Sequence, residues 1–530
     1  MSREPEAGLA QQRELIAALR NSRGFPHAVS DVEIVETHIS WVVLTGQFAY
    51  KIKKAVNLGF LDFSTLERRR YFCEEELRLN RQWSPQLYIG MVSIGGSPDR
   101  PILQGEGEAD EGAIEYALKM RQFPQDAQLD RQLDDGLLRQ QDLLDLAETL
   151  AAGHRTARVI EYENDTESVG KVRAPILENF LPVERTIDMA LLREVHRWTD
   201  RELIAMKPLL IQRRQDGFVR ECHGDLHLAN LVRLPDGIRA FDCIEFSPDL
   251  RNIDVMSDIA FLVMDLVARA RQDLAYAFLN RYLEQTGDYG GMSVFGLYFV
   301  YHSMIRAKVA AIRSTDRDTD EDRRKDIDGV KHYLAVAVRW IRQPSPMLIG
   351  MHGYSGSGKT WLSSQLLTRL PAVRVRSDIE RKRLLGLAET ASTESAPGAG
   401  IYSQGVKQRV YSRLLELAGE LLKSGFHTIV DAAFLKKTER ADLAALAVRA
   451  GVPVVLVSTA AGDTELRRRL DLREQAHADA SEATVAVLNL QRRTCDPLNV
   501  AEQIKVIPVS TDREPDADEI VGRIRSEGVD

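Results

Sequence analysis

The sequence predicts two domains: an N-terminal α+β domain with two lobes around a cleft, and a C-terminal α/β domain on a parallel sheet. Two prolines within residues 341–347 follow a helical run and precede an apolar strand, so we place the boundary after residue 343, giving domains 1–343 and 344–530. Beyond it, strands and helices alternate; before it, a strand-rich stretch gives way to a mostly helical one. With 530 residues and 44% hydrophobic side chains, the chain can bury more than one core.

Composition excludes several classes of protein. The net charge is −8, which disfavours nucleic-acid and anionic-membrane partners. The four cysteines are widely spaced and form no CxxC pair, so we expect neither a disulfide framework nor a thiolate zinc site. No apolar run reaches about 18 residues, and the N-terminus lacks the apolar core of a signal peptide. We therefore expect a cytoplasmic protein of a reducing compartment; its oligomeric state is not predicted.

The N-terminal part begins with strands. Residues 33–54 are rich in β-branched and aromatic side chains and turn near Thr45-Gly46, and residues 66–83 form an amphipathic helix. From about Leu137 the pattern is helical, except for a β-like section over residues 218–246.

In the C-terminal part, apolar or β-branched runs indicate strands of a sheet covered on both faces. The expected strands are 347–352, 373–377, 427–431, 452–458 and 504–510. Helices are predicted between them, for example over 360–370 and 411–425. The low-complexity insert 389–400 is expected to be a mobile loop.

The octapeptide GYSGSGKT carries a strong functional signal. It fits the pattern GxxxxGK[ST] and lies between a predicted strand and a predicted helix, where glycines let backbone N–H groups surround a phosphate. Lys359 would reach the β- and γ-phosphates and Thr360 would offer its hydroxyl to Mg²⁺, so we expect ATP and Mg²⁺ as cofactors. The alternative is a glycine-rich turn without a ligand. The expected nucleotide-binding residues are Gly353, Tyr354, Ser355, Gly356, Ser357, Gly358, Lys359 and Thr360.

Two aspartates end neighbouring predicted strands. Asp431 could hold Mg²⁺, and Asp378 could accept the proton of a substrate hydroxyl at the sheet edge where ligands bind. Each could instead cap the helix that follows it. Arg469 and Arg473, four residues apart on one helix face, could neutralise a transferred phosphoryl group, or could belong to a solvated charged face.

Residues 347–530 resemble the small P-loop kinases related to gluconate kinase, polynucleotide kinase and zeta toxins. The resemblance rests on the phosphate loop, on residues 377–384 and 429–434, on the arginine-bearing segment 469–473 and on residues 479–491. It implies an ATP-dependent kinase, but these relatives phosphorylate different hydroxyl compounds, so it does not identify the acceptor.

A second phosphate-transfer motif lies in the N-terminal part. In His223-Gly-Asp225-x4-Asn230 the carboxylate could accept the proton of an attacking hydroxyl, and the amide could hold Mg²⁺. Asp242 follows a strand twelve residues later and could supply a second metal-binding carboxylate.

This motif resembles that of the aminoglycoside phosphotransferase and choline kinase group, relatives of protein kinases. The resemblance implies a bilobal protein-kinase-like fold with Asp225 as catalytic base, Asn230 and Asp242 as Mg²⁺ ligands, and Asp258 as a support of the loop. His227 is interpreted as a loop-packing residue.

Such a fold also needs a lysine for the α- and β-phosphates and a helix glutamate to orient it. Lys51 is the first choice for the lysine, and Lys53, on the same strand face, is its rival. Glu76 is preferred to Glu74 and Glu75 as the partner.

The whole chain is similar to the bifunctional aminoglycoside phosphotransferase-like/P-loop ATP-binding proteins of bacteria, with residues 50–80 characteristic of that group. We therefore predict two ATP·Mg²⁺ sites, each transferring a γ-phosphoryl group to a hydroxyl of a small molecule. A nucleotide sensor with one non-transferring site is an alternative. Another is a kinase of nucleic-acid 5′-hydroxyls, which would require a basic groove such as Arg381, Lys382 and Arg383 could line.

Overall fold

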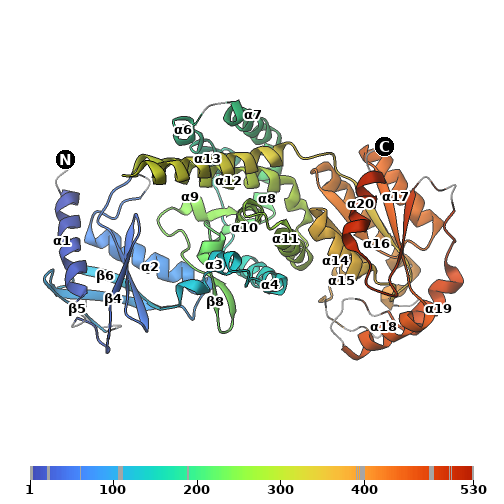
Figure 1. The fold of residues 1–530 in the computed structure, drawn as a ribbon, viewed down its shortest axis with the longest axis horizontal. Helices are drawn as coiled ribbons and strands as arrows, with labels where there is room; N and C mark the ends of the chain where they lie inside the picture. The colour runs from blue at the N-terminus through green and yellow to red at the C-terminus, as the bar shows by residue number, and fades with distance from the viewer. Residues whose placement is uncertain are drawn as a thin grey trace. The chain divides into compact units, whose positions relative to one another are not determined.

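The computed structural model describes residues 4–20, 24–59, 61–105, 112–187, 190–389, 391, 393, 400–476, 481, 483–499, 502 and 504–527 (Figure 1). The chain forms two compact units. Unit 1 comprises Met1–Glu178 and Lys207–Leu262, and unit 2 comprises Asn179–Met206 and Val263–Asp530. The boundary at residue 343 remains a prediction from sequence. Most of the insert 389–400 lies outside the described residues.

Unit 1 contains a six-stranded antiparallel sheet of order β1-β2-β3-β6-β4-β5. Its strands are β1 (Glu33–Glu36), β2 (Ser40–Leu44), β3 (Phe48–Lys53), β4 (Tyr88–Ser97), β5 (Arg100–Leu103) and β6 (Glu115–Arg121). The strands expected over residues 33–54 are confirmed as β1 to β3. The other three were not predicted; in β4, glycines interrupt the apolar pattern.

Strand alternation directs the side chains of β3 to two different helices. Tyr50 and Ile52 face α1 (Glu4–Leu19), whereas Ala49 packs in the cluster that contains Cys73 of α2 (Leu66–Trp83). Lys51 has the same parity as Ala49, so it points toward α2. The amphipathic helix predicted over 66–83 is confirmed, and Thr65 caps it by accepting a hydrogen bond from the Arg68 N–H.

The β-like section of unit 1 consists of short strands separated by loops. These strands are β7 (Val219–Glu221), β8 (Leu231–Leu234) and β9 (Gly237–Ala240), and β10 (Asn252–Asp254) pairs with β7. The loops between them carry residues 223–230 and Asp242. The helices of this unit also include α3 (Leu129–Asp134), α4 (Gln140–Thr156), α5 (Asp165–Leu177), α8 (Lys207–Gln215), α9 (Pro248–Arg251) and the first half of α10 (Val255–Ala268).

Unit 2 joins a group of helices to a parallel sheet. The helices are α6 (Phe180–Glu184), α7 (Ala190–Ala205), the second half of α10, α11 (Gln272–Thr286), α12 (Met292–Thr315) and α13 (Asp320–Ile341). Phe295 of α12 and Trp340 of α13 pack with Phe426, which directly precedes a sheet strand, at ring-centroid distances of 5.9 and 5.8 Å. These helices therefore share a core with the sheet.

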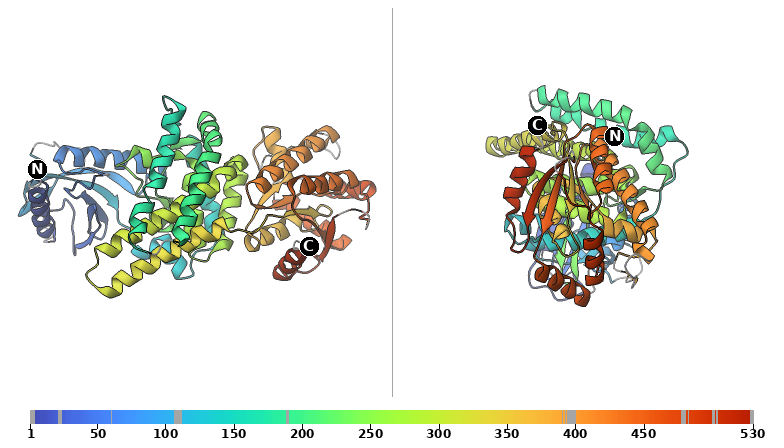
Figure 2. Two further views of the ribbon diagram at one scale, coloured as in Figure 1. Left: turned by 90° about the horizontal axis from the view of Figure 1, so that it is seen from above. Right: turned by 90° about the vertical axis from the view of Figure 1, so that its right-hand side faces the viewer.

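The sheet of unit 2 is parallel, with order β12-β13-β11-β14-β15, as predicted for this part. Its strands are β11 (Leu348–His352), β12 (Ala372–Arg376), β13 (His427–Asp431), β14 (Val454–Ala460) and β15 (Lys505–Ser510). The right-hand view of Figure 2 shows them between the red α20 (Ala517–Glu527) and the orange helices of the opposite face. The strand order reverses beside β11, so the carboxyl ends of β11, β12 and β13 meet at one ligand-binding edge.

Helices cover both faces of this sheet. Helix α14 (Lys359–Arg369) packs with α20, and α16 (Gln404–Lys423) packs with α17 (Lys437–Ala450). Three further helices follow strand ends: α15 (Ser377–Leu384), α18 (Asp463–Ala476) and α19 (Val485–Thr494). Within the described residues, none of the helices is long and apolar enough to cross a membrane.

The outer edge of β12 is covered by α11. The Asn280 side chain donates to the Ala372 carbonyl oxygen at 2.9 Å and accepts from the Arg374 N–H at 2.7 Å. Asn280 is buried, and it satisfies two backbone groups that an edge strand leaves unpaired.

We expect Asn280→Ala to destabilise unit 2 by about 1–3 kcal/mol, because it leaves a buried N–H and a buried carbonyl without partners. Urea unfolding, combined with hydrogen exchange of residues 372–376, measures the effect. The control is Gln285→Ala on the same helix, since the Gln285 side chain donates to the Glu389 carboxylate at 2.9 Å. Unchanged exchange in β12 after Asn280→Ala would contradict this role.

Candidate active sites

The phosphate loop of unit 2 requires glycine at several positions. Gly353, Gly356 and Gly358 have φ of 142°, 81° and 80°, values that other residues rarely adopt. A Cβ on Gly353 would lie 2.5 Å from the Thr459 carbonyl oxygen, and one on Gly356 would lie 2.9 Å from that of Leu466. The loop thus packs closely on its neighbours and leads directly into α14, whose N-terminus can bind an anion.

Lys359 begins α14 and folds back over the loop. Its Nζ donates to the carbonyl oxygens of Gly353 at 2.9 Å and Tyr354 at 2.8 Å. Burial lowers the pKa of Lys359 to about 8; the charge of Arg473 adds to this effect, whereas Asp431 and Asp378 oppose it. Because burial destabilises the Lys359 ammonium, an anion bound beside it would be stabilising.

Thr360 and Asp431 offer hard oxygen atoms on one cavity wall. The Asp431 Oδ2 lies 3.1 Å from the hydroxyl of Ser363, one turn beyond Thr360 in α14. Asp431 does not cap the next helix, because α17 begins at Lys437 and has Lys436 as its N-cap. A hydroxyl and a carboxylate beside a phosphate loop suit Mg²⁺, so the residues fit the expected metal.

Asp378 lies in the first turn of α15 and lines the same cavity as Lys359. The N-cap of α15 is Arg376, so Asp378 is not the capping residue. Burial alone would raise the pKa of Asp378, but Arg381, together with Arg376 and Ser481, holds it below its usual value. Asp378 is thus ionised at neutral pH and can accept a hydrogen bond from a hydroxyl.

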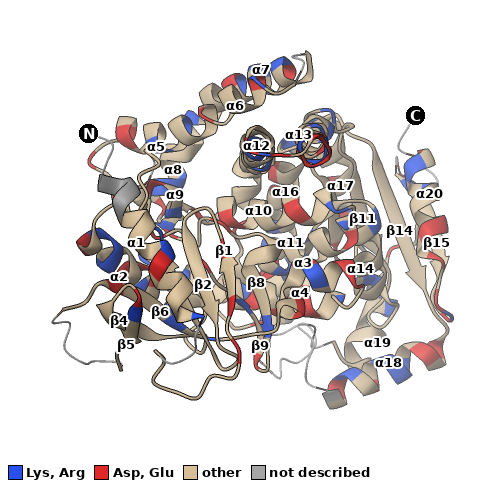
Figure 3. Cartoon of the chain, turned by 60° about the vertical axis from the view of Figure 1, so that its left-hand side comes forward, with Lys and Arg blue, Asp and Glu red and all other residues tan. Residues whose placement is uncertain are grey.

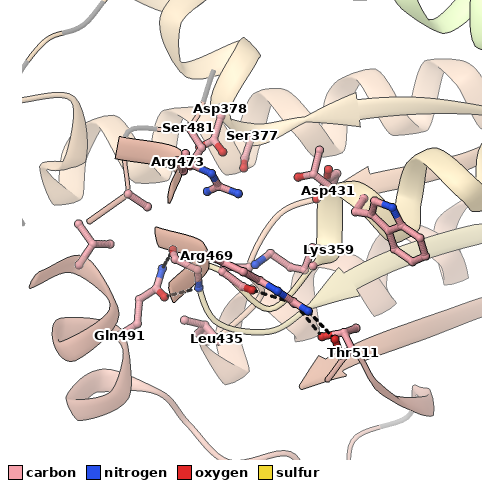
Figure 4. Close-up of a pocket in the computed structure, with 18 of the residues that line it drawn as sticks. Lys359, Ser377, Asp378, Asp431, Leu435, Arg469, Arg473, Ser481, Gln491 and Thr511 are labelled. Atoms are coloured by element: carbon pink, nitrogen blue, oxygen red, sulfur yellow. Dashed lines mark hydrogen bonds between the residues drawn. The ribbon is translucent and has the colours of Figure 1, made fainter. Parts of the chain in front are cut away.

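The two candidate arginines of α18 have different environments. Arg469 donates to the Glu465 carboxylate, to the Gly356 carbonyl oxygen and to Thr511. Arg473, one turn further along, lies beside Asp378 in the cavity (Figure 4). Elsewhere along this helix acidic and basic residues alternate (Figure 3), and the half-exposed Arg467 pairs with Asp463. The solvated-face interpretation therefore holds for part of α18.

These residues surround one cavity of about 590 Å³ (Figure 4). Gln491 of α19 closes it over the loop by accepting from the Ser355 N–H at 2.8 Å and donating to its hydroxyl at 3.0 Å. The predicted residues on its wall are Ser355, Gly356, Gly358, Lys359, Thr360, Asp378, Asp431, Arg469 and Arg473. Of the remaining predicted loop residues, Gly353 and Tyr354 hold the Lys359 ammonium, and the Ser357 hydroxyl lies 2.7 Å from that of Thr459.

In unit 1 the two rival lysines meet the same glutamate. Lys51 Nζ lies 2.8 Å from Glu76 Oε1, and Lys53 Nζ lies 2.7 Å from Glu76 Oε2. Lys53 is 1% exposed and also pairs with Glu245, whereas Lys51 is 11% exposed and also contacts Asp242. Glu74 pairs instead with Arg70, and Glu75 with Arg78.

Ion pairing sets the pKa values of this cluster. Burial opposes charge on Lys51, but Asp242 and Glu76 outweigh it and raise the pKa of the lysine well above its ordinary value. Burial also opposes charge on Glu76 and would raise its pKa. Lys51 and Lys53 outweigh this effect and lower the pKa of Glu76. The lysines and Glu76 are therefore ionised and hold one another in place.

Asp242 has a left-handed backbone, with φ of 65°, and its N–H donates to the Tyr88 hydroxyl at 3.1 Å. Its side chain is 44% exposed. An aspartate held in this uncommon conformation at the edge of a charge cluster can offer its outer oxygen to a cation.

The loop 223–230 brings Asp225 and Asn230 together. The Asn230 amide donates to Asp225 Oδ2 at 2.9 Å and to its carbonyl oxygen at 3.0 Å. The ring of His227 lies 5.4 Å from that of Phe261, and its Nε2 lies 3.5 Å from Asp225 Oδ2. His227 thus packs as expected and also approaches the carboxylate.

Asp258 holds the start of this loop. Its carboxylate accepts from the N–H groups of His223 at 2.8 Å and Gly224 at 2.9 Å, and lies 3.3 Å from His154 Nε2. Gly224 has φ of 85°, and a Cβ there would lie 2.7 Å from the Leu250 carbonyl oxygen. The buried group His154, Cys222 and Asp258 has the composition of a metal site, but two of the Asp258 contacts support the loop backbone.

Sequence analysis missed several residues of both sites. Glu245, Gln491 and His154 lie far along the chain from Lys53, Ser355 and Asp258, the residues that they contact. Of these three, only Glu245 could have been suspected from the local sequence, because it lies three residues after the predicted metal ligand Asp242 in an apolar strand-like run.

Comparisons with known proteins find similarity to several parts of the chain. A family model described as an AAA domain matches residues 348–498. Proteins of Mycobacterium tuberculosis and Mycobacterium bovis, both named as uncharacterised, are 28% identical over 478 residues, which is 89% of this chain and 92% of theirs. The match therefore extends through parts of both units.

Solved structures of kinases also resemble parts of the chain. A choline kinase from Cryptosporidium parvum aligns with 62% of this chain and 96% of its own, at 11% identity and a TM-score of 0.37. The APS kinase of Mycobacterium tuberculosis, in complex with AMPPNP and APS, aligns with 35% of this chain and 98% of its own, at 19% identity and a TM-score of 0.26.

The predicted fold classes are confirmed. The N-terminal region has an α+β fold, in which a strand lysine pairs with a helix glutamate, and the C-terminal region is an α/β P-loop domain with a parallel sheet.

We expect Lys51→Met and Lys53→Met to have different effects. Lys53→Met leaves Glu76 and Glu245 with unbalanced buried charge and should lower the free energy of unfolding by about 3–5 kcal/mol. Lys51→Met should cost less stability, because its second partner Asp242 is half exposed. Urea unfolding monitored by circular dichroism makes the comparison, and equal losses would contradict the different roles.

The lowered pKa of Lys359 predicts proton uptake on nucleotide binding. With a pKa of about 8, roughly three-quarters of Lys359 is neutral at pH 8.5 and roughly one-tenth at pH 7. Phosphates raise this pKa, so ADP binding should take up more protons at pH 8.5 than at pH 7. Calorimetry in buffers of different ionisation enthalpy measures the uptake. Lys359→Arg, which stays charged, should abolish the difference, and uptake that persists in this variant would overturn the assignment.

Proposed function

We propose that this protein is a kinase with two nucleotide sites, each transferring the γ-phosphoryl group of ATP to a hydroxyl of a small molecule. One observation carries the proposal: Lys359, Thr360, Asp378 and Asp431 line a single cavity beside a phosphate loop. This set contains a phosphate-binding cation, two oxygen ligands for a metal and a carboxylate for the acceptor, which are the groups phosphoryl transfer requires.

In unit 2 the loop N–H groups and Lys359 would bind the β- and γ-phosphates. Bound Mg²⁺, held through Thr360 and Asp431, would neutralise phosphate charge. The acceptor hydroxyl attacks the γ-phosphorus as the bond to the β,γ-bridging oxygen breaks, so ADP leaves with that electron pair. Asp378 orients the hydroxyl and accepts its proton as the new bond forms, and Arg473 stabilises the charge on the transferred group.

In unit 1 the same reaction would use a different set of groups. Asp225 lies beside Asn230 and would accept the proton of the hydroxyl. Asn230 and Asp242 fit Mg²⁺ through their side-chain oxygens. Lys51, fixed by Glu76, would exchange its contact with Asp242 for nucleotide phosphates.

The alternative functions lose support from specific contacts. Asp378 lines the same cavity as Lys359, which favours transfer over passive nucleotide sensing. A kinase of nucleic-acid ends would require Arg381, Lys382 and Arg383 to form an open basic groove. Instead, Lys382 is buried and donates to the Glu389 carbonyl oxygen, and the two arginines pair with Asp378 and Glu380.

The test is transfer of label from γ-labelled ATP into a fractionated small-molecule extract, using folded full-length variants. Asp225→Asn should lower formation of one product by about 10²–10⁴-fold, the usual contribution of a positioned base. Lys359→Ala should abolish a different product. The matched controls are Asp236→Asn, an exposed aspartate of unit 1, and Lys423→Ala, an exposed lysine of unit 2. If each variant lost both products, or if neither variant lost any product, the proposal of two separate sites would be contradicted.

A further inference from the structure

Two arginines of the edge strand β12 are largely buried. Arg374 and Arg376 alternate with Val373 and Val375, so both project from the same side of the strand. A buried guanidinium is stable only when its charge and its N–H groups have partners. The side-chain partners of Arg374 come from two helices of unit 2, α11 and α14.

At one end of Arg374 lies Glu284 of α11. Its Oε1 accepts from Arg374 Nη2 at 2.7 Å and from Nε at 3.2 Å, and its Oε2 lies 3.5 Å from Arg376 Nη1. Glu284 is itself buried, and its arginine partners hold its pKa below the usual value against the effect of burial. One carboxylate thus fixes both arginines of β12.

At the other end, Arg374 reaches the first turn of α14. Its Nη1 donates to the hydroxyls of Ser363 at 2.9 Å and Ser364 at 2.7 Å, and lies 3.3 Å from the Thr360 carbonyl oxygen. The hydroxyl of Ser363 is in turn 3.1 Å from Asp431 Oδ2. A continuous chain of hydrogen bonds therefore runs from Glu284 to the two residues that fit Mg²⁺.

We propose that Glu284 is a positioning residue of the P-loop site, which sets Thr360 and Asp431 for metal binding through Arg374 and Ser363. The inference rests on the proposed function, since it concerns the metal of that site. It adds a residue that no local motif indicates: Glu284 precedes the boundary predicted at residue 343 and lies outside the matched segment 348–498. Residues that orient metal ligands commonly change metal affinity when they are replaced.

A purely structural ion pair would act differently from a positioning residue. It would change the stability of unit 2 and weaken nucleotide binding to a similar extent with and without Mg²⁺. A positioning residue changes the Mg²⁺ dependence in particular. The measurement must therefore separate metal affinity from nucleotide affinity and from folding.

The experiment measures ADP binding to the full-length protein at a series of Mg²⁺ concentrations. Trp361 follows Thr360, lines the cavity and is 40% exposed, so its fluorescence reports binding. We expect Glu284→Gln to raise the Mg²⁺ concentration for half-maximal enhancement of ADP binding about 10-fold or more. The ADP affinity without Mg²⁺ should change by less than about twofold. The control Gln285→Ala removes a side chain one position along α11 that contacts Glu389, and should behave as wild type.

A second variant keeps the test decisive if Glu284→Gln folds poorly. Ser363→Ala interrupts the hydrogen-bond chain beside Asp431 without removing a charge, and should raise the half-maximal Mg²⁺ concentration in the same way. In the double variant the effects should not add, because both act through one pathway.

Unchanged Mg²⁺ dependence in Glu284→Gln or Ser363→Ala, with a normal wild type, would overturn the positioning role alone. A wild type whose ADP affinity does not respond to Mg²⁺ would overturn both this role and the proposed metal-dependent function. Neither measurement requires an acceptor, so a protein that transfers no phosphoryl group would still give an answer.

Discussion

The need to pair buried charge organises both units. Taking an ammonium, guanidinium or carboxylate out of water is costly unless an opposite charge and sufficient hydrogen bonds accompany it. Lys51 and Lys53 therefore share Glu76 across β3 and α2, and Arg374 joins Glu284 to α14. Each pair links a strand to a helix, so the positions of the candidate catalytic groups follow from the same contacts that stabilise the core.

The two candidate sites prepare for phosphate in opposite ways. Lys51 already contacts two carboxylates, which raise its pKa, so a nucleotide bound as proposed would replace Asp242 as its partner. Lys359 has carbonyl oxygens as its hydrogen-bond partners and a pKa lowered by burial, so an arriving phosphate relieves an unfavourable state. On the proposed function, nucleotide affinity in unit 1 would depend on competition between anions for Lys51, whereas in unit 2 it would depend on the desolvation of the Lys359 ammonium.

Much of the fold and the local part of each site could be predicted from the sequence. The phosphate loop and the motif around Asp225 are contiguous, and strand parity correctly placed Lys51 and Lys53 on one face. Sequence offered no physical ground for preferring Lys51 to Lys53, because their difference lies in the second partners Asp242 and Glu245, almost 200 residues away. Nor could it find Glu284, since an acidic residue in an amphipathic helix normally faces solvent. The strand β4 escaped detection because its glycines obscure alternation.

The covering of β12 by α11 has a consequence for how such proteins can evolve. Asn280 occupies the backbone groups to which another strand would otherwise bind. A P-loop segment separated at residue 343 would expose that edge, which could pair with the same edge of a second copy and lead to aggregation. Exchange of the P-loop domain between genes is therefore constrained: a viable recombination would carry α11 with it, so the inherited module begins well before the phosphate-binding motif.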